Sequence, residues 1–202
     1  MGYMRIILIG ILIFSFSSCR HKIEREIINY EYFDITESEM LNKEILSAIT
    51  NEEYLQYGSS VAYINEKGDT IIPFGKYAYY GTDTFVHFAN VMVHPNDSTY
   101  GRQVGINRHQ KILFDLVMFD NGPEPFKEGL IRILRNGKMG YANEYGKIVI
   151  PCIYDYAKWF HDGEAEVTFD AVEFRDMDEH LRVESDEWFL IDMNGKKIKN
   201  AP

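Results

Sequence analysis

Carboxylates are the residues of this sequence best suited to do chemistry, and they gather toward its C-terminal end. Asp155, Asp162 and Glu164 lie close together in the chain, and two such groups held a few ångströms apart act as general acid and general base in hydrolysis. The acidic residues continue as far as Glu187, a density that raises the question of cation binding. The run lacks calcium-loop spacing with its glycine, so we expect no metal site.

Other reactive groups give weaker signals. Cys152 lies in an apolar stretch, residues 148–153, where a small buried hydrophobic side chain is a better interpretation than a catalytic thiol. The histidines are scattered singly, without zinc-ligand spacing. No nucleophile elbow, phosphate-cradling loop or dinucleotide fingerprint occurs. We therefore predict no catalytic residue and no cofactor, with a hydrolase that uses Asp155, Asp162 and Glu164 as the alternative.

Aromatic residues are abundant, with 14 Tyr, 13 Phe and 2 Trp. Most are expected to fill the core, because aromatic side chains bury the largest area per residue. Two clusters, residues 77–80 and 154–160, also contain rings that alternate with partners on the opposite face. We predict a binding surface for a protein or a glycan that includes Tyr79, Tyr156 and Trp159.

The first nineteen residues resemble a bacterial lipoprotein signal. Arg5 precedes an apolar run, residues 6–14, and small residues lead to Cys19. The resemblance implies removal of residues 1–18 and acylation of Cys19. The run has about half of the roughly twenty residues that a transmembrane helix needs. An ordinary secretory signal, in which Cys19 is incidental, is the alternative.

The net charge and the residue after Cys19 bear on the predicted localisation. The chain has 21 basic and 31 acidic residues, a net charge of −10, which repels phosphate backbones and disfavours nucleic acid as a partner. Contact with the membrane must then come from lipid on Cys19. Arg20 follows the cysteine where an aspartate would favour inner-membrane retention, so we expect lipid anchoring in the cell envelope of a Gram-negative bacterium, at the outer membrane.

The N-terminal part of the mature chain is predicted as a tether, a strand and a helix. Residues 19–26 form the lipidated tether, and residues 27–59 contain the strand and the helix. Residues 27–35 mix Ile and Tyr with acidic residues, which is typical of a strand. Thr36 and Glu39 form a capping box, and Leu41, Ile45 and Ile49 recur every four residues. This pattern predicts one amphipathic helix that ends near residues 48–50.

Repeated turns dominate residues 60–202. In three segments an Asn or Asp stands three residues before a Gly, at Asn65, Asn143 and Asp192. The short polar side chain bonds the backbone two residues on, and the glycine accepts a left-handed conformation, so each segment predicts a corner between two strands. A weaker copy, residues 104–107, is followed by no glycine at this place. Residues 126–130 and 160–164 share a second turn pattern, 34 residues apart.

Residues 137–167 resemble the WG (KWG) repeat family. Trp188 keeps the tryptophan of the motif, whereas Met139 and Val61 replace it. The resemblance implies an array of β-hairpins common in bacterial surface lipoproteins, without an assigned reaction. We therefore predict a mainly β fold of serial antiparallel hairpin repeats with one short N-terminal helix. The expected function is a lipid-anchored, non-catalytic interaction module, with an envelope hydrolase or a purely structural lipoprotein as alternatives.

Overall fold

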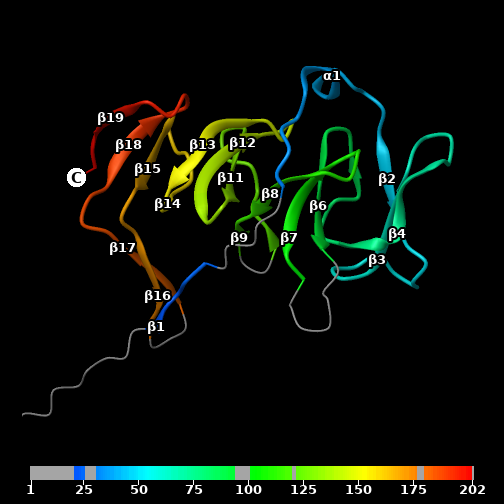
Figure 1. The fold of residues 1–202 in the computed structure, drawn as a ribbon, viewed down its shortest axis with the longest axis horizontal. Helices are drawn as coiled ribbons and strands as arrows, with labels where there is room; N and C mark the ends of the chain where they lie inside the picture. The colour runs from blue at the N-terminus through cyan, green and yellow to red at the C-terminus, as the bar shows by residue number, and fades with distance from the viewer. Residues whose placement is uncertain (1–20, 26–30, 94–100, 120–121, 177–179, 202) are drawn as a thin grey trace, which may run out of the picture.

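The computed structural model describes residues 21–25, 31–93, 101–119, 122–176 and 180–201. The described chain is mainly β, with strands paired in antiparallel sheets and one short helix, α1 (Glu37–Met40). The predicted fold class is confirmed. In Figure 1 the strands follow one another along the long axis of the molecule, from β2 at one end to β19 at the other.

Four three-stranded units build the series. In each unit the second strand pairs with both the first and the third. The strands are β2 (Leu46–Ile49), β3 (Ser60–Ile64) and β4 (Thr70–Tyr79); β6 (Phe88–Val93), β7 (Gln103–Asn107) and β8 (Ile112–Leu116); β11 (Leu130–Arg135), β12 (Lys138–Asn143) and β13 (Ile148–Tyr154); and β15 (Glu164–Thr168), β18 (Phe189–Asp192) and β19 (Lys197–Asn200).

The same irregularity recurs in all four units. Between the second and third strands a register shift occurs at an equivalent place, so an extra residue bends the third strand, and the first and third units have a second shift just before it. This shared shift aligns the units position by position, and the second and third units are offset by 36 residues. The pairs before and after the shift are Tyr63 with Ile72 and Ile64 with Thr70; Gly105 with Phe114 and Ile106 with Ile112; Tyr141 with Ile150 and Ala142 with Ile148; and Leu190 with Lys199 and Ile191 with Lys197.

An Asx corner joins these two strands in every unit. At Asn143 the side-chain oxygen accepts hydrogen bonds from the backbone N–H groups of Tyr145 and Lys147, both at 3.1 Å. Asn65 and Asp192 accept the same two bonds, so the three predicted corners are confirmed. The second unit repeats the arrangement at Asn107.

The corner of the second unit keeps its shape without a glycine. Gln110 takes the glycine's place with a φ of 64°, in the left-handed region. Its backbone N–H donates to the carbonyl of Asn107 at 2.9 Å, as Gly146 does to Asn143 in the third unit. The weaker copy recognised in the sequence is therefore a complete unit.

The second turn pattern also forms as expected from its residues. Glu128 and Gly129 both have positive φ, and so do Asp162 and Gly163, which is the conformation of a type I′ hairpin turn. The two turns touch, because the backbone N–H of Gly163 donates to the Glu128 carboxylate at 3.0 Å. Neighbouring units thus meet through equivalent turns.

Sheet pairing links the first three units and then changes. β4 pairs with β6 and β8 pairs with β11, so the first three units share one ten-stranded sheet that ends at β13. The fourth unit forms its own sheet with the short strand β14 (Tyr156–Ala157). A hydrophobic cluster with Tyr141, Ile150 and Ile191 packs the third unit on the fourth. Each unit therefore stacks on its neighbour, as in other repeat proteins.

Short strands complete the connections. The last unit contains an inserted hairpin, β16 with β17, and β1 adds to its edge. Another two-residue strand, β5, pairs with β2, and β9 pairs with β10. These elements are β1 (His21–Lys22), β5 (Thr84–Phe85), β9 (Met118–Phe119), β10 (Gly122–Pro123), β16 (Val172–Arg175) and β17 (Leu181–Glu184).

The predicted N-terminal helix is wrong in its extent. The capping box forms at Thr36 and Glu39, but the helix ends at Met40, and Leu46 to Ile49 form β2 on the edge of β3. Leu41, on the predicted apolar face, is 79 % exposed, whereas Leu46 is fully buried. Pairing with β3 therefore outweighs the helical spacing, and β2 lies in the same sheet as the strands beyond residue 60.

Ahead of the helix, residues 31–36 run extended along β8 without forming a strand, contrary to the predicted strand at residues 27–35. We call residues 31–36 the strap. In Figure 1 it rises past β8 to α1. Residues 27–30 of the predicted strand, residue 26 of the predicted tether, the signal sequence and Cys19 lie outside the described residues. Within the described residues, no helix has the length and apolar character that crossing a bilayer requires.

Candidate functional site

The three predicted surface aromatics separate into two places. Tyr79 is 8 % exposed and lies in the hydrophobic cluster of the first two units. Its hydroxyl donates to the Asp83 carboxylate, and burial raises its pKa to about 12. Tyr156 and Trp159 are half-buried and lie between the third and fourth units. Only these two therefore contribute to one candidate site.

Arg132 of β11 joins Tyr156 and Trp159. Its guanidinium carbon lies 5.8 Å from the Tyr156 ring centroid and 5.4 Å from that of Trp159, within the range of cation–π attraction. Arg132 Nε donates to Glu124 Oε2 at 2.8 Å, and Nη1 donates to the Ala157 carbonyl at 2.9 Å. Burial alone would lower the pKa of Arg132, but Glu124 outweighs it and raises the pKa.

Further cations and rings extend this contact into a ladder. Lys127 Nζ lies 5.2 Å from the Trp159 ring centroid. Tyr156 meets Trp188 edge-on, with centroids 6.2 Å apart, and Lys158 Nζ lies 4.9 Å from the Trp188 ring centroid. We call Lys127, Trp159, Arg132, Tyr156, Trp188 and Lys158 the cation–ring ladder. It contains both tryptophans of the chain.

Sequence reasoning found two members of the ladder and missed the other four. Trp188 was recognised only as the tryptophan of a repeat. Its signal was available, because it stands 49 residues after Met139, the equivalent position of the third unit, and the insertion in the fourth unit lengthens the spacing. The partners of Arg132 could not be found in the same way, since Glu124 belongs to a connection outside the repeated pattern.

A groove of about 440 Å³ opens beside Trp159. Lys158, directly after β14, and Glu166 of β15 form an ion pair there, with Nζ and Oε2 2.6 Å apart. The groove therefore combines a tryptophan ring with charged groups of both signs, a composition suited to binding a polar ligand that also has an apolar face. Its lining residues are Lys127, Lys158, Trp159, Phe160, His161, Glu164, Glu166 and Leu190.

The carboxylates considered for hydrolysis have separate surroundings. Glu164 lines the Trp159 groove. Asp155 forms an ion pair with Lys138, and Asp162 occupies the type I′ turn with its side chain 92 % exposed. In the part of the chain that the structure describes, no group of three or more His, Cys, Asp or Glu side chains is arranged to hold a metal ion.

Cys152 lies on β13 and packs, half-buried, against the hydrophobic cluster of the second and third units. Burial raises the pKa of its thiol to about 11. The thiolate, which is the nucleophilic form, is therefore scarce near neutral pH. The prediction of a structural side chain agrees with these surroundings.

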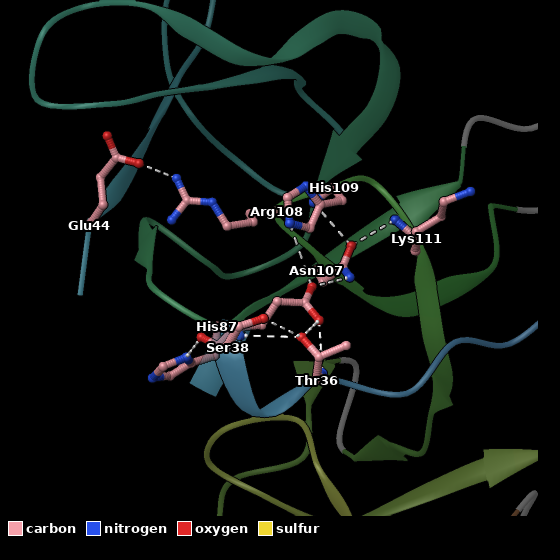
Figure 2. Close-up of polar contacts among 9 residues, drawn as sticks. Thr36, Ser38, Glu44, His87, Asn107, Arg108, His109 and Lys111 are labelled. Atoms are coloured by element: carbon pink, nitrogen blue, oxygen red, sulfur yellow. Dashed lines mark hydrogen bonds and ion pairs between the residues drawn. The ribbon is translucent and has the colours of Figure 1, made fainter. Parts of the chain in front are cut away.

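A second polar cluster surrounds Glu39 at the end of α1, and Figure 2 shows its members. The Glu39 carboxylate accepts hydrogen bonds from the Thr36 backbone and from the side chain of Asn107, both at 2.8 Å. His87 Nδ1 lies 3.2 Å from the Glu39 carbonyl oxygen. Arg108 pairs with Glu44 in the same region. These contacts fasten α1 and the segment after it to the corner of the second unit, and we assign the cluster a structural role.

The fold and the groove define a serial β-hairpin repeat protein with an aromatic site between two units. The model of the family described as WG containing repeat matches residues 139–170, a stretch that includes the corner of the third unit and Trp159. Residues 139–170 thus match the WG containing repeat, as the resemblance of residues 137–167 predicted. No curated protein and no solved structure matches the chain.

Proposed function

We propose that this chain is a lipid-anchored, non-catalytic interaction module of the bacterial cell envelope. The observation that carries the proposal is the Trp159 groove, where a half-buried tryptophan lies among Lys127, Lys158, Glu164 and Glu166. Aromatic rings pack on the apolar faces of ligands, and charged side chains around them bond to hydroxyl, amide or charged groups. A glycan or a polar protein segment offers both kinds of surface.

The ladder gives the groove a fixed shape. Arg132 is tied to Glu124, to the Ala157 carbonyl and to two rings at once, so Trp159 lies on a rigid support. A preorganised ring loses little conformational entropy when a ligand packs on it. Residues 139–170 match a structural repeat. A binding site that depends on how two units pack together therefore fits the fold better than a catalytic site.

The anchor is the second part of the proposal. The supporting observation is the sequence that ends in Cys19, with its basic residue, short apolar run and small residues before the cysteine. Acyl chains on Cys19 would hold the repeats at the surface of the outer membrane, and the net charge of −10 would keep the rest of the domain off anionic headgroups.

The binding test uses the two tryptophans as separate reporters. A Trp188→Phe variant of the full chain retains Trp159 as its only tryptophan, and a Trp159→Phe variant retains Trp188. Each is titrated with soluble peptidoglycan fragments and, separately, with envelope extract fractionated into protein and glycan. We expect saturable fluorescence changes for the Trp188→Phe variant and at least tenfold weaker binding for a Trp159→Ala variant. Identical titrations of the wild type and Trp159→Ala would reject this site.

The anchor test compares the wild type with a Cys19→Ala variant in intact cells. We expect the wild type in the detergent-soluble membrane fraction and the variant released from the membrane, with the same folded repeats by circular dichroism. Equal membrane retention of both proteins would show that Cys19 carries no anchor and would leave the groove proposal standing.

A further inference from the structure

The strap occupies a seat on the second unit. The backbone N–H of Phe33 donates to the carbonyl of Ile112 on β8 at 2.9 Å. Lys111 Nζ lies 4.5 Å from the Phe33 ring centroid, and the Tyr32 hydroxyl donates to Asp115 at 2.6 Å. Arg135 of β11 also donates to the Phe33 carbonyl at 2.7 Å. The extended segment is thus held by two bonds to its main chain, a cation over a ring and a buried carboxylate. This is how peptides dock on sheet edges.

The third unit carries the same seat 36 residues later. The shared register shift pairs Ile112 with Ile106 and, equivalently, Ile148 with Ala142, so both carbonyls occupy the same position on their strands. No backbone hydrogen bond from outside the sheet reaches the Ile148 carbonyl within the described residues. The residues of the first seat and their equivalents are Lys111 and Lys147, Ile112 and Ile148, and Asp115 and Pro151.

The equivalent seat is an open groove. A groove of about 540 Å³ lies along β13, the last strand of the ten-stranded sheet, and Lys138, Lys147, Ile148 and Pro151 all line it. Two positions that hold the strap on the second unit, Lys111 and Ile112, therefore have counterparts, Lys147 and Ile148, in the wall of this groove. β13 is a sheet edge within the described residues, and such edges accept an added extended segment.

The charge of the groove restricts its occupant. Arg135, Lys138 and Lys147 line it; Arg135 pairs with Asp34 of the strap at 3.0 Å, and Lys138 pairs with Asp155, so one positive charge remains in excess. A basic groove on a chain with a net charge of −10 favours an acidic partner. Lys147 stands where Lys111 lies over Phe33, so it selects an aromatic residue.

We infer that the β13 groove binds an extended acidic peptide segment of a partner protein, with an aromatic residue under Lys147 and a main-chain bond to Ile148. The strap is the template for this ligand. Pro151 replaces Asp115 and offers no side-chain acceptor, so the tyrosine hydroxyl that the strap uses is not needed here. The inference concerns a site apart from the Trp159 groove, and neither depends on the other.

The test uses a fluorescent peptide with the sequence of residues 31–36 and the full chain in detergent solution, with binding followed by anisotropy. We expect saturable binding that weakens at least tenfold for a Lys147→Glu variant and for a peptide with Phe33→Ala. A peptide with Tyr32→Phe should bind as well as the parent. The matched control is Lys196→Glu, which changes the equivalent exposed lysine of the fourth unit and leaves binding unchanged.

Three outcomes would overturn the inference. The first is no saturable binding of the peptide to the wild type, and the second is equal binding to the wild type and to Lys147→Glu. The third is weaker binding to Lys111→Glu but not to Lys147→Glu, because the peptide would then be replacing the strap in its own seat on β8. Melting curves of Lys147→Glu and Lys147→Gln check that the variants fold. Trp159→Ala must leave peptide binding unchanged, which separates failure of this inference from failure of the proposed function.

Discussion

The side-chain amide of Asn107 donates to the Glu39 carboxylate at 2.8 Å, while the Asn107 side-chain oxygen accepts the two backbone bonds of its corner. One side chain therefore closes the turn of the second unit and fastens the capped helix to it. The helix has a single turn, too short to be stable in isolation. Its position depends on this bond and on the capping box.

The Glu39 carboxylate should make stability depend on pH in the acid range. Burial alone would raise its pKa, but hydrogen bonds from Thr36 and Asn107, with the charge of His109, outweigh burial and lower the pKa below 4.5. A lowered pKa in the folded state stabilises the fold above the unfolded pKa, and this is lost as pH falls through the folded pKa.

We expect Glu39→Gln, which weakens the hydrogen bonds from Thr36 and Asn107 by removing the charge of their acceptor, to lower the free energy of unfolding by about 1 kcal/mol at pH 7, with the difference from the wild type shrinking below pH 4.5. Urea unfolding of both proteins at a series of pH values measures this difference. Glu37→Gln, at an exposed position of the same turn, is the control and should follow the wild type. A Glu39→Gln difference that stays constant down to pH 3 would contradict the assignment.

The extent of the helix shows where sequence reasoning fails in this chain. Thr36 and Glu39 define its start, and that local signal is correct because capping involves neighbouring residues only. Leu41 and Ile45 have helical spacing, yet Leu46 and Ala48 also alternate as a strand does. The choice is made by β3, more than ten residues away in the chain, and a local pattern contains no information about it.

The site shows the same division. The corners at Asn65, Asn143 and Asp192 were predictable since each is made by four or five consecutive residues. Trp159 was found from its residue type. The groove itself depends on how the third and fourth units stack and on Arg132, whose partners come from three different segments. Such long-range contacts follow from packing rather than from spacing.

The side-chain oxygen of Asn143 should be the stabilising part of its corner. Asn143→Ala removes the acceptor of two backbone N–H groups, those of Tyr145 and Lys147, and we expect a loss of about 1 to 2 kcal/mol in the free energy of unfolding. Asn143→Asp keeps the oxygen and should unfold near the wild-type midpoint, since Asp192 has the same role in the fourth unit. Equal losses for the two variants would show that the oxygen does not matter.

Gln110 allows the cost of its left-handed backbone to be measured. Gln110→Gly and Gln110→Ala both remove the side-chain bonds to the Ile71 carbonyl and to Lys76. Only Ala retains the strain of a φ of 64°, so Gln110→Gly should be about 1 to 2 kcal/mol more stable than Gln110→Ala. The control is exposed Glu66 in the first corner, which has no positive φ. There the Glu66→Gly variant should not be more stable than the Glu66→Ala variant. A more stable Gln110→Ala would refute the assigned conformation.

The Arg132–Glu124 ion pair should be costly to break from one side. The two side chains are 9 % and 3 % exposed, with Nη2 and Oε2 2.7 Å apart. Glu124→Ala leaves a buried guanidinium without its carboxylate, and we expect a loss of about 3 to 5 kcal/mol. The double variant Arg132→Met with Glu124→Leu removes both charges and should lose clearly less. Denaturant unfolding measures the free energy of unfolding of the two variants. A double variant less stable than Glu124→Ala would contradict the prediction and show that the ion pair makes a net contribution to stability.

The Cys152 thiol should react slowly in the folded protein. Burial raises its pKa to about 11 from 9.0, so at pH 7.5 the folded chain holds about a hundredfold less thiolate than the unfolded chain, and alkylation depends on the thiolate. In a Cys19→Ser background, where Cys152 is the single thiol, we expect iodoacetamide to label the native protein about a hundredfold more slowly than the protein in urea. The native rate should rise about tenfold per pH unit up to pH 10. Equal native and unfolded rates at pH 7.5 would mean that Cys152 has an accessible, ionised thiol and would reopen its assignment as a structural residue.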